Sequence, residues 1–368
     1  MAQFTFAETT PLLSPYSAVA NYSAPVRISA SELQSTSPQS VGFDPIKIDA
    51  LRAAIHDNTY KNIHSVLVVR NGLVAVEDYQ PGAGEDGKLR DYTSATLHEI
   101  HSATKSVNSI LIGIARDQYT SCSVDQKIST FFPELSDVFT SAGKCDITVK
   151  HLLAMSSGLS WNEEEVSYTN DQNDHVRMNR SADPVRYVLE RPMIAIPGAE
   201  FRYNSGISIV LGEIIHRVSG MPADDYADKH LFKPLDITDY HWLKYPNGTV
   251  QTGGGLWLRP RDMAKIGLLM LNHGRWNGQQ IVSRQWVQDS VMQQVRGRTY
   301  GYQWWLGSLH NGGQEVFTFG ALGRGGQFIL VLPELQMVTV FTGWNDGNGL
   351  GDQPYDMLQR YILPALVL

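Results

Sequence analysis

Cysteine is scarce in this sequence: Cys122 and Cys145 are the two thiols among 368 residues. So low a count excludes a disulfide framework, and the lack of a Cys-x-x-Cys spacing argues against a zinc site of that type. The two thiols either form one bridge in an oxidising compartment or remain free. The sequence favours neither alternative, because it does not give the separation of the two side chains.

Runs of basic residues and long apolar segments are also missing. The net charge of −7 and the lack of a Lys/Arg cluster predict no nucleic-acid partner. No apolar stretch is long enough to predict a membrane span. The N-terminus lacks the basic-then-apolar pattern of a secretory signal, so we expect a cytoplasmic location, or a periplasmic or secreted one if a signal was removed. The sequence does not indicate the oligomeric state.

Secondary-structure signals divide the chain into distinct stretches. Residues 1–40 are rich in Ser, Thr, Pro, Ala and Gln and predict an extended N-terminal arm. A helix is expected to start at Asp44-Pro45, and two β-branched runs joined by Asn71-Gly72 predict a hairpin. Helical periodicity dominates the middle of the chain, strand signals return late, and an apolar helix is expected near 353–365.

Strands at both ends and helices between them predict an α/β plus α fold, with a sheet built from both chain ends and an inserted helical domain. Residues 41–105 and 285–368 would form the sheet domain, and residues 106–284 the helical domain. A chain of this length can bury a core of that size.

The tetrapeptide pattern Ser-x-x-Lys occurs twice, as Ser102/Lys105 and as Ser141/Lys144. A lysine whose pKa is lowered by burial can take the proton of a serine nucleophile. On a helix, residues i and i+3 share one face, so the pattern brings the two groups together only if the segment is helical. An apolar helical pattern starts at the first pair, whereas Gly143 interrupts the second. We therefore expect Ser102 and Lys105 to carry the chemistry and Ser141 and Lys144 to lie in an exposed loop.

Tyr203 stands in a polar loop just before a helical pattern, beside Asn204 and Ser205. A phenol held near a lysine ammonium can lose its proton and act as a general base toward a serine. The alternative is a tyrosine that packs its ring and exposes its hydroxyl. The residues alone leave both open.

Other catalytic classes find little support. His98, Glu99 and His101 do not have the His-Glu-x-x-His spacing, and the sequence shows no third ligand, so we expect no metal and no cofactor. The pattern Gly-x-Ser-x-Gly is absent, which argues against the nucleophile elbow of α/β-hydrolases. Gly253-Gly254-Gly255 predicts close backbone packing near the cleft.

Six segments in order carry a family resemblance: "SATKS", "ITVKHLLAMSSGLSW", "PGAEFRYNSG", the segment "GGGLWLRPRDMAKIGLLMLNHG", "YGYQWW" and "GALGRGGQFILVLPELQMVTVFTG". Together the segments resemble serine β-lactamase-like hydrolases of the class C type, which include family VIII carboxylesterases and 6-aminohexanoate-dimer hydrolases. The resemblance runs from about residue 40 to the C-terminus. It implies an antiparallel sheet flanked by helices, an active site in the cleft between the domains, and an acyl-enzyme mechanism without a cofactor.

The resemblance implies roles for individual residues. Ser102 would be the acylated nucleophile, and Lys105 and Tyr203 would share the general base and acid duties. Ser205 stands where the family often has an asparagine that contacts substrate. The family's Lys-Thr-Gly motif aligns with residues 318–320, ending at Gly320, so its lysine is missing. The backbone N–H of Ala321 would then join that of Ser102 in the oxyanion hole.

The missing lysine bears on the substrate. In penicillin-recognising relatives that lysine helps to bind a carboxylate, so its absence favours an uncharged ester or a linear amide, although Arg324 could restore positive charge. Tyr168, in the acidic loop 161–180, is a substrate contact by resemblance. Trp304 and Trp305 are expected to line the acyl pocket, and the equal alternative is that one of the two belongs to the core.

These residues predict a serine hydrolase acting on a small-molecule ester or amide. Short-chain esters rank first, linear amide oligomers of the aminohexanoate type second, and β-lactams or muropeptides third. The non-enzymatic alternative is a catalytically silent binding protein of the same fold. Retention of Ser102, Lys105 and Tyr203 together argues against it, because losing any one would abolish the mechanism.

Overall fold

A computed structural model describes residues 32–140, 143–347 and 349–367. Most of the expected N-terminal arm, residues 1–31, lies outside the described residues. The part of the arm that is described runs along the sheet domain, where Ser35 forms a parallel bridge with Val74 and Leu33 is buried. A short 3-10 turn, η1 (Pro38–Val41), then leads into the first helix.

The central element is a six-stranded sheet in the order β10-β11-β12-β13-β1-β2, in which every neighbouring pair is antiparallel. Two strands come from the start of the chain and four from its end. The bounds are β1 (Ile63–Arg70), β2 (Leu73–Tyr79), β10 (Trp305–Asn311), β11 (Gln314–Gly323), β12 (Gln327–Leu332) and β13 (Met337–Gly343). The expectation of an antiparallel sheet built from both chain ends is confirmed.

The hairpin of β1 and β2 forms at the turn that the sequence indicates. Arg70 pairs with Leu73, and Asn71 and Gly72 occupy the two turn positions with φ of 53° and 80°. Such a tight turn needs positive φ at both central residues, which Asn and Gly adopt at low cost. Pairing of β1 with β13 then joins an early strand to a late one, so the sheet is complete only when β13 is in place.

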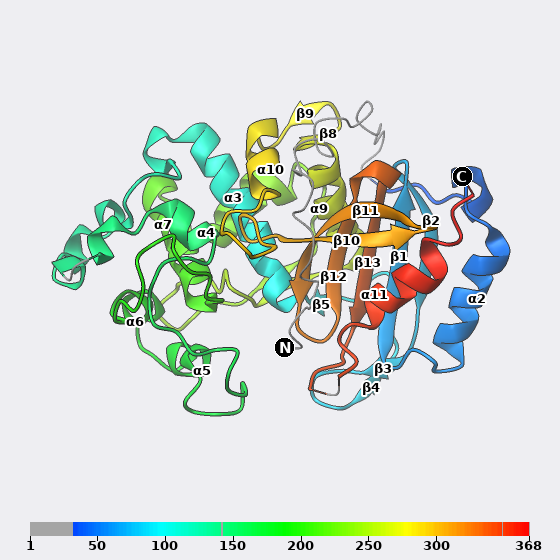
Figure 1. The fold of residues 1–368 in the computed structure, drawn as a ribbon, viewed down its shortest axis with the longest axis horizontal. Helices are drawn as coiled ribbons and strands as arrows, with labels where there is room; N and C mark the ends of the chain where they lie inside the picture. The colour runs from blue at the N-terminus through cyan, green and yellow to red at the C-terminus, as the bar shows by residue number, and fades with distance from the viewer. Residues whose placement is uncertain (1–31, 141–142, 348, 368) are drawn as a thin grey trace.

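Helices cover both faces of this sheet (Figure 1). On one face lie α2 (Pro45–His56), α11 (Gln353–Met357) and η10 (Leu358–Ile362), which share one apolar cluster with the sheet. Asp44 caps α2 by accepting a hydrogen bond from the Ile46 N–H, as the Asp-Pro start predicts. The other face packs on α9 (Pro260–Leu271) and on α3 (Thr104–Gln118), within a larger cluster that continues into the helical region.

The helical region forms the opposite half of the molecule in Figure 1. Its main helices are α3, α4 (Val149–Leu153), α5 (Asp174–Asn179), α6 (Pro184–Leu189), α7 (Ser205–Ser219), α8 (Ala223–Ala227), η8 (Asp228–Phe232) and α10 (Arg284–Ser290). Asn204 caps α7 and Gly220 ends it in the left-handed conformation. The expected loop 161–180 is only partly a loop, because Asn173 caps α5 within it. The domain boundaries expected from the sequence remain a prediction.

Short strands complete the fold: β3 (Gly82–Ala83) pairs with β4 (Leu89–Arg90), β8 (Arg275–Trp276) with β9 (Gln279–Gln280), and β7 (Leu256–Leu258) lies between β5 (His98–Glu99) and β6 (His241–Trp242). The three-stranded sheet matters for the site. By pairing His98 with Leu258, it carries the segment before Ser102 next to the segment that follows Gly253.

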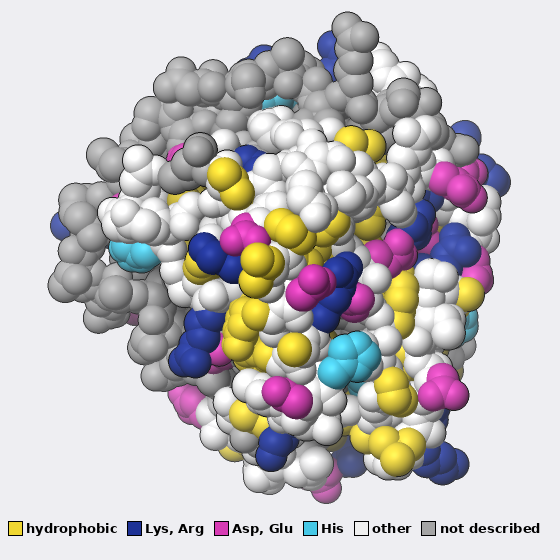
Figure 2. Space-filling model, turned by 90° about the vertical axis from the view of Figure 1, so that its right-hand side faces the viewer, with side chains coloured by type: hydrophobic (Ala, Val, Ile, Leu, Met, Phe, Trp, Pro, Cys, Tyr) yellow, Lys and Arg dark blue, Asp and Glu magenta, His cyan; other side chains and the backbone are white. Residues whose placement is uncertain are grey.

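Three global expectations can be compared with the structure. Cys122 is buried and Cys145 is exposed, and both are free thiols, so the bridge is not formed. Among the described residues, no helix has the length and apolar character needed to cross a bilayer. On the face shown in Figure 2, Lys/Arg and Asp/Glu side chains are interspersed rather than gathered by sign.

Candidate active site

Ser102 lies in a single 3-10 turn, η2 (His101–Ala103), which runs directly into α3. The preceding residue, His101, has φ of 46°, a left-handed conformation that is costly for a residue with a side chain. The turn thereby leaves Ser102 partly exposed while the helix behind it is buried on every side. The strained turn therefore leaves the Ser102 hydroxyl partly exposed, next to a buried helix.

Lys105 follows one turn later and points back at the serine. Its Nζ lies 3.0 Å from Ser102 Oγ and 2.7 Å from the carbonyl oxygen of Gly253. Both partners are uncharged, and the side chain is 1% exposed. Burial therefore lowers the pKa of Lys105 to about 8, although the nearby carboxylates of Glu163 and Glu164 act in the opposite direction. At this pKa a useful fraction of the lysine is neutral near pH 8 and can accept a proton.

Tyr203 lies against the same lysine. The Lys105 ammonium sits 5.0 Å from the centre of the tyrosine ring, and the hydroxyl interacts with Ser102. Burial raises the pKa of Tyr203 well above 10, with further contributions from Tyr300 and Glu163. The phenol is therefore protonated in the free protein, and the contact with the lysine does not make it a base.

A cavity of about 460 Å³ reaches this site at Tyr203, whose hydroxyl interacts with Ser102; Ser102 and Lys105 are not among the residues that line it. Tyr203 and Trp305 form part of its wall, and their rings are stacked with centroids 6.1 Å apart. Tyr168 lines the same cavity from the acidic loop, as does Arg324 from the segment after β11. The cavity also carries the carboxylates of Glu163, Glu164, Glu165, Asp346 and Asp352. An acid-rich wall of this kind disfavours substrates with a carboxylate close to the reacting carbonyl.

The strand next to Ser102, β11, carries two glycines that bear on the expected register of the third motif. Gly320 and Ala321 pair with Leu330 and Ile329 inside the sheet, and neither lines the cavity. Gly323 is the glycine that meets the serine turn: a Cβ there would lie 2.1 Å from the carbonyl oxygen of Ile100. The alignment of the third motif to residues 318–320 stays a prediction, and Gly323 offers a second register that ends three positions later. Glycine spacing alone does not distinguish these two registers.

A family model for beta-lactamase matches residues 64–355. The chain belongs to the beta-lactamase family. It is 25% identical over 329 residues to the 6-aminohexanoate-dimer hydrolase of Paenarthrobacter ureafaciens, covering 82% of this chain and 79% of that protein. It is 27% identical over 172 residues to the lovastatin esterase of Penicillium rubens, covering 41% of each chain.

Solved structures of the same fold agree with this assignment. A family VIII carboxylesterase superposes with a TM-score of 0.63 at 18% identity, covering 88% of this chain and 99% of that one. At such identity the likeness shows the fold alone. Membership of the beta-lactamase family, with esterase and amidase relatives, makes the chain a serine hydrolase and leaves the choice of substrate to the site.

Glu163 is the site residue that the sequence did not reveal. Its carboxylate is buried and accepts four hydrogen bonds, from Trp161 Nε1, Tyr168 Oη, Ser205 N and Ser205 Oγ. The signal was present as Trp161, a large aromatic residue at the start of an otherwise polar loop. Such a residue tends to be buried, and its neighbours are then drawn inward with it.

Two of the expected substrate contacts lie elsewhere in this beta-lactamase fold. Ser205 is 2% exposed and gives its hydroxyl to Glu163 at 2.5 Å, so it supports the cavity wall from behind. Trp304 is fully buried and packs edge-on against Phe319, whereas Trp305 faces the cavity. Of the tryptophan pair, Trp304 is thus the core residue. Successive residues at the start of a strand point to opposite sides, which separates the two.

Arg324 and Tyr168 do lie in the cavity, as expected. The Arg324 guanidinium forms an ion pair with Asp346 and lies 5.1 Å from the centre of the Tyr168 ring. Its positive charge is therefore already matched by a carboxylate. Arg324 does not replace the positive charge of the missing third-motif lysine, which leaves the cavity without an unpaired cation from this strand.

The second Ser-x-x-Lys pair has a different environment from the one expected. Ser141 lies outside the described residues. Lys144 is 5% exposed rather than on an exposed loop, and its Nζ donates to the carbonyl oxygen of Leu189 at 2.7 Å. The lysine ties the segment before α4 to the end of α6. Lys144 is buried because the helices around it pack together. The glycine in the sequence of this segment predicts a turn and does not indicate that packing.

One group of side chains near the serine could hold a cation. Ligand atoms of Glu85, Glu99 and His101 lie within 4.8 Å of one another. Burial lowers the pKa of His101 to about 3, so its ring is neutral and can act as a ligand at neutral pH. Glu85 is the third residue that the sequence did not show. No step of the hydrolysis requires a cation at this position.

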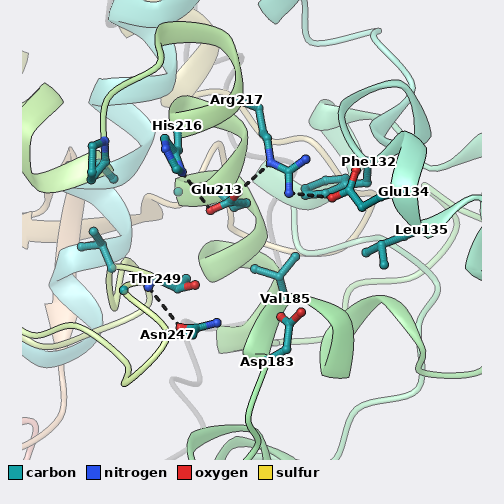
Figure 3. A pocket seen from close by; sticks show the side chains of 15 residues that line it. Phe132, Glu134, Leu135, Asp183, Val185, Glu213, His216, Arg217, Asn247 and Thr249 are labelled. Atoms are coloured by element: carbon teal, nitrogen blue, oxygen red, sulfur yellow. Dashed lines mark hydrogen bonds and ion pairs between the residues drawn. The ribbon is translucent and has the colours of Figure 1, made fainter.

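A second cavity of about 440 Å³ is lined in part by Glu213, His216 and Arg217 of α7 (Figure 3). There Arg217 pairs with both Glu213 and Glu134, and Asn247 caps the Thr249 N–H. The residues that line this cavity do not include Ser102, Lys105 or Tyr203, so it is not the candidate reaction site.

Proposed function

We propose that the chain is a carboxylesterase that hydrolyses short-chain esters through an acyl-enzyme on Ser102. The observation that carries the proposal is the 3.0 Å contact between Ser102 Oγ and the buried Lys105 Nζ, whose pKa is lowered to about 8. A serine next to a lysine that can be neutral is an activated nucleophile. The cavity of about 460 Å³ that Tyr203 lines beside this pair is large enough for a small ester.

In this mechanism neutral Lys105 takes the proton of Ser102 as the hydroxyl oxygen attacks the ester carbonyl. The Ser102 N–H and a second N–H from the end of β11, that of Ala321 or, in the register ending at Gly323, that of Arg324, donate to the developing oxyanion, a contribution of about 3 kcal/mol per donor. The C–O bond then breaks, and Tyr203, whose hydroxyl is protonated, passes a proton to the leaving alkoxide while Lys105 restores it. The alcohol leaves and Ser102 carries the acyl group.

Deacylation repeats these steps with water as the nucleophile. Lys105 takes a proton from the water, the hydroxide oxygen adds to the acyl carbon, and the bond to Ser102 Oγ breaks. The serine oxygen regains a proton through the lysine and tyrosine, and the carboxylic acid departs. All groups needed for both halves belong to the chain itself.

An amidase acting on linear amides is the second candidate. It is supported by the similarity to the 6-aminohexanoate-dimer hydrolase over 82% of this chain and by the position of Tyr168 in the cavity wall. A phenol there could accept or donate a hydrogen bond to an amide group. β-lactams and muropeptides rank third, because the cavity carries five carboxylates and its Arg324 is paired with Asp346.

The test is a side-by-side assay of p-nitrophenyl butyrate, a linear amide dimer and nitrocefin, together with intact-mass analysis after a fluorophosphonate. We expect one covalent adduct at Ser102 and the highest kcat/KM with the butyrate ester. Substitution Ser102→Ala should lower kcat by about a thousandfold or more. Near-normal turnover by Ser102→Ala would disprove the mechanism, and preference for the amide dimer would favour the second candidate.

A further inference from the structure

The acidic loop places one fully enclosed carboxylate beside the reacting groups. Glu163 Oε2 accepts from Trp161 Nε1 at 2.7 Å and from Ser205 N at 2.8 Å. Glu163 Oε1 accepts from Tyr168 Oη at 2.8 Å and from Ser205 Oγ at 2.5 Å. Four donors on two oxygens saturate a carboxylate, so this side chain is held in one orientation.

The same carboxylate is ionised despite its burial. Burial by itself would raise the pKa of Glu163, but His175, Lys105 and the two hydrogen bonds from Ser205 outweigh it and hold the pKa below its ordinary value. Lys105 experiences the complementary effect: its hydrogen-bond partners are neutral, and Glu163 is the largest contributor that favours its charged form. A buried charge is costly unless an opposite charge is near.

We propose that Glu163 is a positioning residue of this hydrolase: its carboxylate fixes Ser205 and Tyr168 at the cavity wall and sets the charge state of Lys105. The inference rests on the proposed function, in which Lys105 is the base for Ser102. The carboxylate holds the start of α7, and therefore Tyr203, in place against the lysine. It also keeps Lys105 protonated until the pH approaches 8.

Other ionisable groups surround this pair. Those that interact electrostatically with Lys105 or Glu163 are Glu164, His101, His175, Tyr168, Tyr203 and Tyr245. Burial lowers the pKa of both histidines and raises the pKa of the three tyrosines and of Glu164 from its acidic value. Among these groups Lys105 contacts Ser102 Oγ at 3.0 Å, so we assign the acid limb of the activity profile to Lys105.

The substitution Glu163→Gln separates charge from hydrogen bonding. The amide oxygen can accept from Trp161 Nε1 and Ser205 N, as Oε2 does. The amide nitrogen can donate to the hydroxyls of Ser205 and Tyr168, because a hydroxyl rotates from donor to acceptor. All four contacts can thus be kept while the negative charge is lost. A purely structural role would leave the pH dependence unchanged.

The experiment compares kcat/KM for p-nitrophenyl butyrate from pH 6 to 9 in wild type and Glu163→Gln, normalised by fluorophosphonate titration of active serine. Without the carboxylate the lysine loses its proton more easily, so the acid limb moves to lower pH. The ratio of kcat/KM at pH 6 to that at pH 9 should rise by at least about threefold, since one pH unit on the limb is about tenfold. In Glu163→Asp, which keeps the charge, the limb should stay close to that of wild type.

Ser205→Ala and Tyr168→Phe are the matched variants, because each removes one hydrogen bond to Glu163 and keeps its charge. We expect lower turnover in both, with an unmoved limb. An unmoved limb in Glu163→Gln, or its failure to fold while the two matched variants fold, would overturn the proposal. Loss of the Ser102 adduct or of the acid limb in wild type would instead count against the proposed function.

Discussion

Lys105 Nζ donates to the carbonyl oxygen of Gly253 at 2.7 Å, across 148 positions of the chain. The glycine is needed there, because a Cβ would lie 2.7 Å from the carbonyl oxygen of Ser205. The expectation of close backbone packing at Gly253 is therefore confirmed. The contact seats the lysine between the serine turn and the start of α7 with only neutral acceptors, and this arrangement makes its proton removable.

The two buried lysines of the Ser-x-x-Lys pairs offer a direct comparison. Lys105→Met should lower kcat for ester hydrolysis by about a thousandfold or more, because the base is lost. Lys144→Met should keep kcat within about twofold and lower the melting temperature, because it leaves the Leu189 carbonyl without its buried donor. Steady-state kinetics of both variants test the expected kcat values, and thermal unfolding tests the expected change in melting temperature. A thousandfold loss of kcat in folded Lys144→Met would contradict the assignment.

Two glycines of β11 test the register next to Ser102. Gly323→Ala should lower kcat by about a hundredfold, because a Cβ would meet the Ile100 carbonyl at 2.1 Å and push the strand off the serine turn. Gly320→Ala meets the Leu330 side chain at 2.6 Å and should cost stability, with kcat of the folded fraction retained. Kinetics normalised by active-site titration distinguish them. The reverse ranking would support the register ending at Gly320.

The neighbouring tryptophans should separate binding from stability. Trp305→Ala removes a cavity wall that stacks on Tyr203, so KM for the butyrate ester should rise several-fold. Trp304→Ala leaves a hole in the core and should cost about 3–5 kcal/mol in unfolding free energy. Urea unfolding and initial-rate kinetics measure the two effects. A KM effect confined to Trp304→Ala would place the acyl pocket on the other side of β10.

Two buried histidines, His64 and His98, predict that the folded protein loses stability at acid pH. Burial lowers the pKa of His64 to about 4 and that of His98 to about 3, below the ordinary value of 6.5. The unfolded chain then binds more protons between pH 6.5 and 4, so stability falls as the pH drops through this window, by about 2–3 kcal/mol for each histidine. Unfolding free energies at pH 7 and pH 4.5 should differ less in His64→Gln than in wild type. The exposed His56→Gln is the control and should show the wild-type difference.

Local patterns in the sequence determined the parts of the fold that depend on near neighbours. The capped start of α2, the Asn71-Gly72 hairpin and the helical phase that joins Ser102 to Lys105 each follow from residues a few positions apart. Such features are encoded by backbone conformations and helical periodicity, which act over one or two turns. The six motifs in order indicated the family. The family resemblance in turn implied an antiparallel sheet built from both chain ends.

Tertiary structure decided what depends on distant segments. The close approach of Gly323 to the Ile100 carbonyl, and the burial of Trp304 beside a Trp305 that lines the cavity, depend on segments distant in the sequence. The position of Glu163 depends on two contacts. The buried Trp161 donates to its carboxylate, and α7 brings the Ser205 N–H to the same carboxylate. Burial and the charges of remote side chains, rather than spacing along the chain, set the pKa values of the site, and these appear only once the chain is folded.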